Sequence, residues 1–64
     1  MIKTVIRLQN MVMVFDARGE QVPKYQGQYR DVRKNIMRDA SSETIFTRWS
    51  NYDSEPETVS REEW

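Results

Sequence analysis

Residues 2–16, IKTVIRLQNMVMVFD, decide the fold of this chain. They hold two runs of large and β-branched side chains that alternate in the manner of β-strands, with a polar pair at residues 9–10 between them. A turn at that pair predicts a hairpin with Leu8 opposite Met11. One face of the hairpin is then expected to carry seven side chains, most of them large and apolar: Ile2, Thr4, Ile6, Leu8, Met11, Met13 and Phe15.

The downstream sequence predicts three further elements. A turn at residues 16–19, Asp-Ala-Arg-Gly, leads into a short strand at residues 20–22, which ends at Pro23 because proline lacks an amide hydrogen. Apolar residues then recur at spacings of three and four over residues 28–40 and predict a helix with one apolar stripe. Residues 44–49 alternate again and predict a fourth strand.

These elements predict a small α+β domain over residues 1–52 in the order β-β-β-α-β. The helix is expected to cover the larger apolar face of an antiparallel sheet of three to four strands, with either Ile45 or Phe46 turned inward. A chain of 64 residues is close to the size at which a single core only just suffices. Additional buried surface is therefore expected from a second copy or from another protein.

The smaller face of the hairpin carries three valines and is predicted to stay uncovered. It is a candidate interface, with Trp64 as a further candidate anchor because aromatic residues dominate binding hot spots. The residues predicted for this interface are Val5, Val12, Val14 and Trp64. A second interpretation of Trp64, left open at this point, is that it covers the core of its own chain.

Charge is sorted along the chain. Residues 1–38 contain eight Lys or Arg and three Asp or Glu, whereas residues 39–64 contain two and seven. The last part, residues 53–64, is predicted to be a flexible acidic tail because it has few apolar side chains to bury. On the basic side, one helix face and the segment just upstream form a candidate contact for a partner or a nucleic acid, made of Lys24, Arg30, Arg33, Lys34 and Arg38.

Several function classes are disfavoured by composition. The chain has no Cys and no His, so a zinc site and the usual nucleophilic catalytic groups have no ligands or bases. We expect no catalysis, no cofactor and no metal. The longest apolar run, residues 11–15, is too short to cross a bilayer. A cytoplasmic protein of bacterial type is expected.

One segment resembles a known family. Residues 16–24, DARGEQVPK, resemble the turn, strand and proline segment of the swapped-hairpin AbrB-type transition regulators, which are dimeric DNA-binding proteins that often act as antitoxins. The match covers nine residues, and there is one residue fewer between Gly19 and Pro23 than the family pattern has, which reverses the alternation of the strand. The leading hypothesis is a noncatalytic, self-associating or protein-binding module that associates through an open sheet edge or the valine face. The alternative is a nucleic-acid-binding or antitoxin-like regulator that uses the basic face of the helix.

Overall fold

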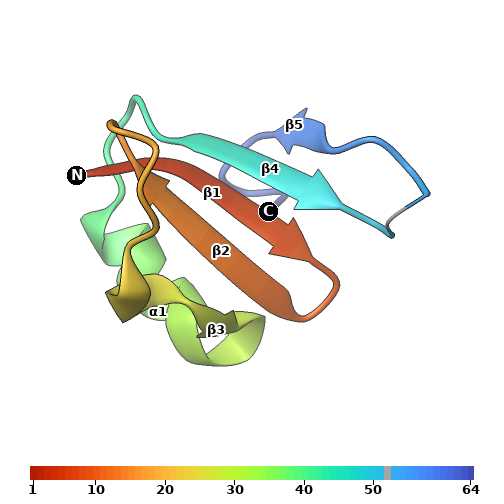
Figure 1. Ribbon diagram of the computed structural model, residues 1–64, viewed down its shortest axis with the longest axis horizontal. Helices are drawn as coiled ribbons and strands as arrows, with labels where there is room; N and C mark the ends of the chain where they lie inside the picture. The colour runs from red at the N-terminus through yellow and green to blue at the C-terminus, as the bar shows by residue number, and fades with distance from the viewer. Residues whose placement is uncertain (52) are drawn as a thin grey trace.

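The computed structural model describes residues 1–51 and 53–64, in which one α-helix packs on a five-stranded mixed sheet (Figure 1). The strand order in the sheet is β3-β2-β1-β4-β5. In chain order the elements are β1 (Ile2–Leu8), β2 (Met11–Asp16), the 3-10 turn η1 (Pro23–Tyr25), β3 (Gly27–Gln28), α1 (Tyr29–Asp39), β4 (Ile45–Trp49) and β5 (Glu57–Val59). The α+β class is confirmed, but the sheet is neither wholly antiparallel nor limited to four strands.

The predicted hairpin forms the centre of the sheet. β1 and β2 pair antiparallel with Leu8 opposite Met11, as the sequence predicts. The turn residue Gln9 has a φ of 54°. This is a left-handed backbone conformation that residues other than Gly and Asn seldom adopt. At the other end a bulge between Ile2 and Thr4 shifts the pairing, so that Ile2 lies opposite Asp16. This bulge turns Ile2 onto the valine face of the sheet, where it is buried.

The chain between β2 and β4 explains why β4 runs parallel to β1. Residues 17–28 return to the β1–β2 turn, where β3 pairs with the start of β2. The helix then carries the chain back to the first residues of β1, and the hydroxyl of Thr44 donates to the carbonyl of Ile2 at 2.8 Å. β4 therefore starts beside the start of β1, with Thr4 opposite Ile45. The prediction of an all-antiparallel sheet is wrong for this reason.

The predicted turn at residues 16–19 is present, but the predicted strand at residues 20–22 is reduced to a single bridge. Gly19 has a φ of 83°, and its amide donates to the Asp16 carbonyl. Within residues 20–22, Gln21 forms a single bridge with Phe15. Pro23 opens η1, so the chain leaves the sheet and returns to it at β3.

The end of the chain is part of the domain, which corrects the prediction of a tail at residues 53–64. β5 pairs antiparallel with β4. Ser60 and Glu63 then form a reciprocal cap, in which the Glu63 amide donates to the Ser60 hydroxyl at 3.3 Å and the hydroxyl lies 2.9 Å from the Glu63 carboxylate. This turn returns the chain over the sheet, so that Trp64 is only 2% exposed. The boundary predicted after Tyr52 lies outside the described residues.

The core lies on the valine face of the sheet, opposite to the face that the sequence predicts. The helix contributes its predicted stripe, with Val32 and Ile36 buried, and β4 turns Phe46 inward and Ile45 outward. The full set of buried apolar residues is Ile2, Val5, Val12, Val14, Tyr25, Val32, Ile36, Phe46 and Trp64. The helix and the Trp64 segment thus share one side of the sheet.

The other side of the sheet, here called the open face, consists of the strand positions that alternate with this core. Register places eleven residues on it: Thr4, Ile6, Leu8, Met11, Met13, Phe15, Gln28, Ile45, Thr47, Trp49 and Thr58. Met11 is 55% exposed and Ile45 is 41% exposed. Among the described residues, none of its apolar side chains belongs to the core cluster or packs against it.

Candidate interaction surface

The predicted valine interface is core. Val5 and Val14 are fully buried and Val12 is 1% exposed, because the helix and Trp64 cover them. This burial removes all four predicted interface residues, Trp64 included, from the surface. The helix and the indole of Trp64 both pack over these small β-branched side chains. The larger apolar face, predicted to be covered by the helix, lies opposite the helix instead. At one end of this face the Trp49 indole Nε1 donates to the Ser54 carbonyl of the β4–β5 connection.

Trp64 resolves the alternative left open by the sequence, since it packs within its own chain. Its ring centroid lies 5.2 Å from that of Tyr29 and 5.3 Å from that of Phe46. Its indole Nε1 donates to the Thr47 carbonyl at 2.9 Å, so the buried polar atom has a partner. The burial of Trp64 has one signal in the sequence, the capping-box spacing of Ser60 and Glu63. The turn that these two residues form returns the chain to the sheet, so that the indole packs on it.

Arg7 lies on the covered side of the sheet and joins the same cluster. Its guanidinium is 3.6 Å from the centroid of the Tyr29 ring and donates to the backbone oxygen of Trp64 at 3.0 Å. The Tyr29 hydroxyl donates to that same oxygen at 2.9 Å. The arginine therefore packs on an aromatic ring as a cation–π contact and is a structural group here.

The five predicted basic contact residues are all exposed, and most have partners within the chain. Arg33 donates to the Tyr29 hydroxyl at 2.7 Å, and Arg38 forms an ion pair with Asp39 at 2.9 Å. Arg30 lies 3.9 Å from Asp31. Lys24 is 5.5 Å from the centroid of the Tyr25 ring, and Lys34 is exposed on the helix. The structure therefore distributes these cations over η1 and α1, and four of the five lie beside a partner from the same chain.

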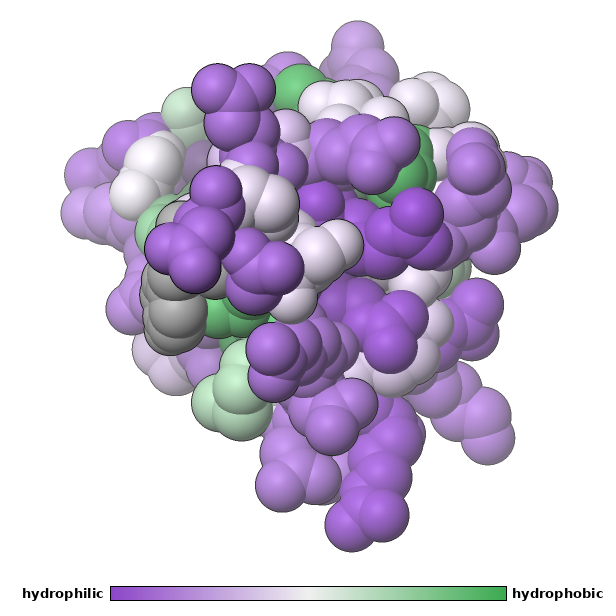
Figure 2. Space-filling model, turned by 90° about the vertical axis from the view of Figure 1, so that its right-hand side faces the viewer, coloured by the Kyte–Doolittle hydropathy of each residue, from purple (hydrophilic) through white to green (hydrophobic). Residues whose placement is uncertain are grey.

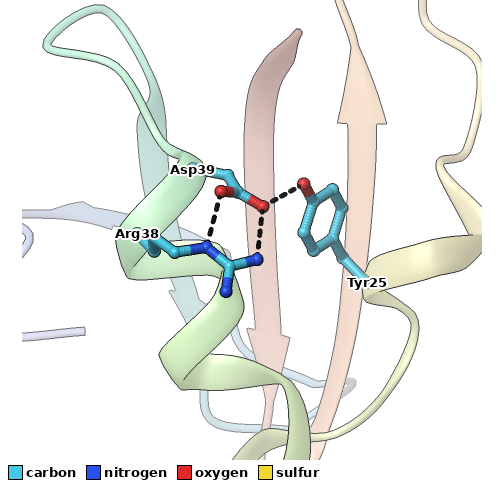
Figure 3. A network of polar contacts seen from close by, with 3 residues as sticks. All are labelled: Tyr25, Arg38 and Asp39. Carbon is cyan, nitrogen blue, oxygen red and sulfur yellow. Dashed lines mark hydrogen bonds and ion pairs between the residues drawn. The ribbon is translucent and has the colours of Figure 1, made fainter.

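A polar network at the end of α1 was not predicted from the sequence (Figure 3). Asp39 accepts a hydrogen bond from the Tyr25 hydroxyl at 2.5 Å and one from Arg38 Nε at 2.9 Å. A carboxylate in the last turn of a helix is unfavourable to the helix dipole, so these two donors offset its placement. The Arg38 and Tyr25 hydrogen bonds lower the pKa of Asp39 to about 2. The same contact with Asp39, together with burial, raises the pKa of Tyr25 above its usual 10.0.

This network ties η1 to the helix and has little capacity for acid–base chemistry. A carboxylate with such a low pKa is a weak base near neutral pH, and the raised pKa of Tyr25 keeps its hydroxyl protonated. Among the described residues, no three His, Cys, Asp or Glu side chains lie close enough together to hold a metal ion. The network is best explained as a latch between two elements.

The Asp39 latch predicts a specific acid dependence of stability. Because its pKa is depressed in the folded chain, its contribution is present above the ordinary value of 3.8 and is lost as pH falls toward about 2. We therefore expect Asp39→Asn to lower the urea midpoint at neutral pH, and the difference from the unmodified chain to close in that acid window. Asp31→Asn, which removes an exposed carboxylate of the same helix, is the control and should change the midpoint less. A pH-independent difference would contradict the latch.

Two hollows on the described surface do not combine groups for a reaction. One hollow of about 500 Å³ lies between the α1–β4 loop and the turn after β5. The Arg61 guanidinium crosses it to donate to the Ser41 carbonyl at 2.9 Å and lies 5.5 Å from the centroid of the Phe46 ring. A second hollow, of about 290 Å³, lies at the start of α1 and is lined by Asn10, Gln28, Tyr29 and Arg30. Neither wall presents two carboxylates.

The open face is the remaining candidate, and it differs in character from the rest of the surface. Seven of its eleven positions are apolar and none is charged, in a chain with 31% charged residues. The side of the molecule at the right of Figure 1 is by contrast mainly hydrophilic, with hydrophobic residues showing only in separate small areas (Figure 2). The alternation of large apolar side chains in residues 2–16 predicts this apolar surface correctly, but the prediction that it forms the core is wrong.

Comparisons with known proteins give no relative for the chain: no protein-family model, no curated protein and no solved structure matched it significantly. The AbrB-type resemblance of residues 16–24 therefore still rests on nine residues, which here form a turn, one bridge and the start of η1. Within the described residues, no helix combines the length and the apolar character that a bilayer-spanning segment needs.

Proposed function

We propose that this protein is a noncatalytic interaction module that binds a protein surface through its open face. The single observation that carries the proposal is the inverted polarity of the sheet. In a sheet with one solvated face, the polar side chains normally point to water. Here the face opposite the helix has no charged residue at its eleven described positions and is mainly apolar, with Met11 and Ile45 exposed. Contact with another surface removes water from such a face, and this burial of apolar area favours association.

The absence of a suitable reaction site among the described residues is compatible with this proposal but does not carry it. The nearest approach to a set of ionisable groups is the Asp39 latch, where both pKa shifts oppose proton transfer near neutral pH. Nucleic-acid binding by the basic side of α1 stays a prediction, as does a cytoplasmic location in a bacterium. Four of the five basic residues have a neighbouring side chain on the same chain as a partner, and the contacts of the described residues do not favour a phosphate backbone over other partners.

Site-specific photo-crosslinking in cells tests the proposal. A photoreactive amino acid at Met13, near the middle of the open face, is expected to crosslink to a protein. The same amino acid at Ser42, on the exposed loop between α1 and β4, is the control and should not give that product. If Met13, Leu8 and Ile45 positions all yield no protein crosslink while the chain is folded, the open face is not a binding surface and the proposal fails.

A further inference from the structure

We infer that the partner of the open face is a second copy of this chain. The two sheets would pack face to face, with both α1 helices on the outside, to give a symmetric dimer. This inference rests on the proposed function and names its partner. Four observations bear on it: the charge of the face, the placement of the strand arginines that accounts for that charge, the area, and the sheet edges.

Charge is the first. A symmetric dimer brings a surface against itself, so any charge near its centre meets a like charge. At the chain average of 31%, eleven positions would carry about three charges, but the open face has none. A surface shaped for a charged partner would carry the complementary sign. A neutral apolar face is suited to its own copy.

The placement of the strand arginines is the second. Arg7 and Arg48 are paired across β1 and β4 and point to the covered side, although two adjacent cations repel each other. Both arginines have acceptors on the covered side. Arg7 donates to the backbone oxygen of Trp64, and Arg48 donates to the backbone oxygen of Glu63 at 3.4 Å. The long charged side chains of these two strands are thus held on the helix side. Ile6 and Leu8, which flank Arg7, remain on the open face.

Area is the third. The five strands have seven, six, two, five and three residues, and at a rise of about 3.3 Å per residue and a spacing of about 4.8 Å they give a footprint of roughly 360 Å². This is about a twelfth of the 4512 Å² accessible surface of the chain. Two copies would bury roughly 700 Å², less than the roughly 1,000 Å² that a stable interface usually exceeds, so the area fits a weak, reversible association. We therefore expect a dimer that dissociates in the micromolar range.

The fourth observation concerns the edges of the sheet. They offer less surface for self-association than the open face does. On the β2 edge, the Gln26 side chain donates to the Val14 carbonyl at 2.9 Å and accepts from the Val14 amide at 3.3 Å. The Val22 amide donates to the same carbonyl. At the opposite edge, β5 has only three residues. Strand addition therefore has little free backbone to use, whereas two twisted sheets pack readily face to face.

Ile6 is the residue that should lie nearest the middle of this interface. It belongs to the central strand, with Met13 on one side and Thr47 on the other. Ile6→Lys would place one ammonium group from each copy in the apolar contact, close to its own symmetry mate. We expect the dissociation constant to rise at least about a hundredfold. The monomer should remain folded, because this side chain does not pack against the core cluster.

Sedimentation equilibrium from micromolar to millimolar concentration tests the inference on four chains: the unmodified protein, Ile6→Lys, Met11→Lys and Ser42→Lys. Met11 is already 55% exposed, so its lysine variant tests the same face with little risk to folding. Ser42→Lys adds the same charge away from the face. The expected result is a concentration-dependent dimer for the unmodified chain and Ser42→Lys, and weaker association for the two open-face variants, with unchanged circular dichroism.

The results also separate this inference from the proposed function. An unmodified chain that stays monomeric throughout, or open-face variants that dimerise as well as it does, would overturn the second-copy assignment. A Met13 crosslink to a different protein, with a monomeric chain in the centrifuge, would overturn the dimer while supporting the interaction module. A crosslink from Met13 to the chain itself would support both.

Discussion

Trp64→Ala is expected to leave much of the protein unfolded at room temperature. Truncating a buried tryptophan costs about 3–5 kcal/mol, and a 64-residue domain has a total stability of roughly 3–10 kcal/mol. The indole is 2% exposed and packs on Tyr29 and Phe46, so its loss opens a cavity beside the valines. Urea denaturation followed by far-ultraviolet circular dichroism measures the loss.

Trp64→Phe is the matched variant. It keeps an aromatic ring in the site but removes the donor to the Thr47 carbonyl, so we expect a smaller loss of about 1–2 kcal/mol. An alanine variant with an unchanged urea midpoint would show that the Trp64 side chain does not contribute to the folded domain. In that case the original expectation of an independent acidic tail would be the better description.

Ile36→Asp has the second large expected effect and should abolish the cooperative unfolding transition. Ile36 is fully buried at the centre of the helix stripe, and an aspartate there has no partner for its charge. The expected cost exceeds about 4 kcal/mol, comparable to the whole stability. Thermal melting at neutral pH, with two controls, gives the measurement.

The two controls separate burial from helix propensity. Lys34→Asp puts the same residue on the exposed side of α1 and is expected to leave a cooperative transition. Ile36→Val removes one methylene from the core and should cost about 0.5–1.5 kcal/mol. A cooperative melt of Ile36→Asp near the temperature of the unmodified chain would mean that the helix packs on the sheet through another stripe.

Local patterns in the sequence predicted the hairpin, the helix and the Asp16–Gly19 turn, but not the loss of the strand at residues 20–22. The alternation in residues 2–16 predicted the hairpin and its Leu8–Met11 register, and the spacing of Val32 and Ile36 predicted the buried side of the helix. The Asp16–Gly19 turn was predictable because Asp and Gly each have a defined role in it. The Asp16 carboxylate accepts from the Arg18 and Glu20 amides, and Gly19 takes the positive φ.

Long-range choices were not predictable, and one of them decides the candidate site. Counting apolar side chains favoured the face of Ile6 and Met13 as core, because it has more of them. The number of apolar side chains on a face does not show which segments of the chain can pack over it. Trp64 arrives from a segment too polar to fold alone, and the bulge at Ile2 adds a further apolar group to the valine side. The same error placed the interface on the wrong face.

The parallel pairing of β1 with β4 determines the order in which the protein can fold. β2 follows β1 after two residues and can pair with it within microseconds, but the other edge of β1 waits for residues 45–49. Closing that long loop costs chain entropy before its contacts form, which slows folding. Until then the hairpin has an unpaired edge on β1, which is a site for pairing with another chain. Docking of β4 closes that edge, so the interval before β4 docks is the one in which edge-to-edge aggregation is a hazard.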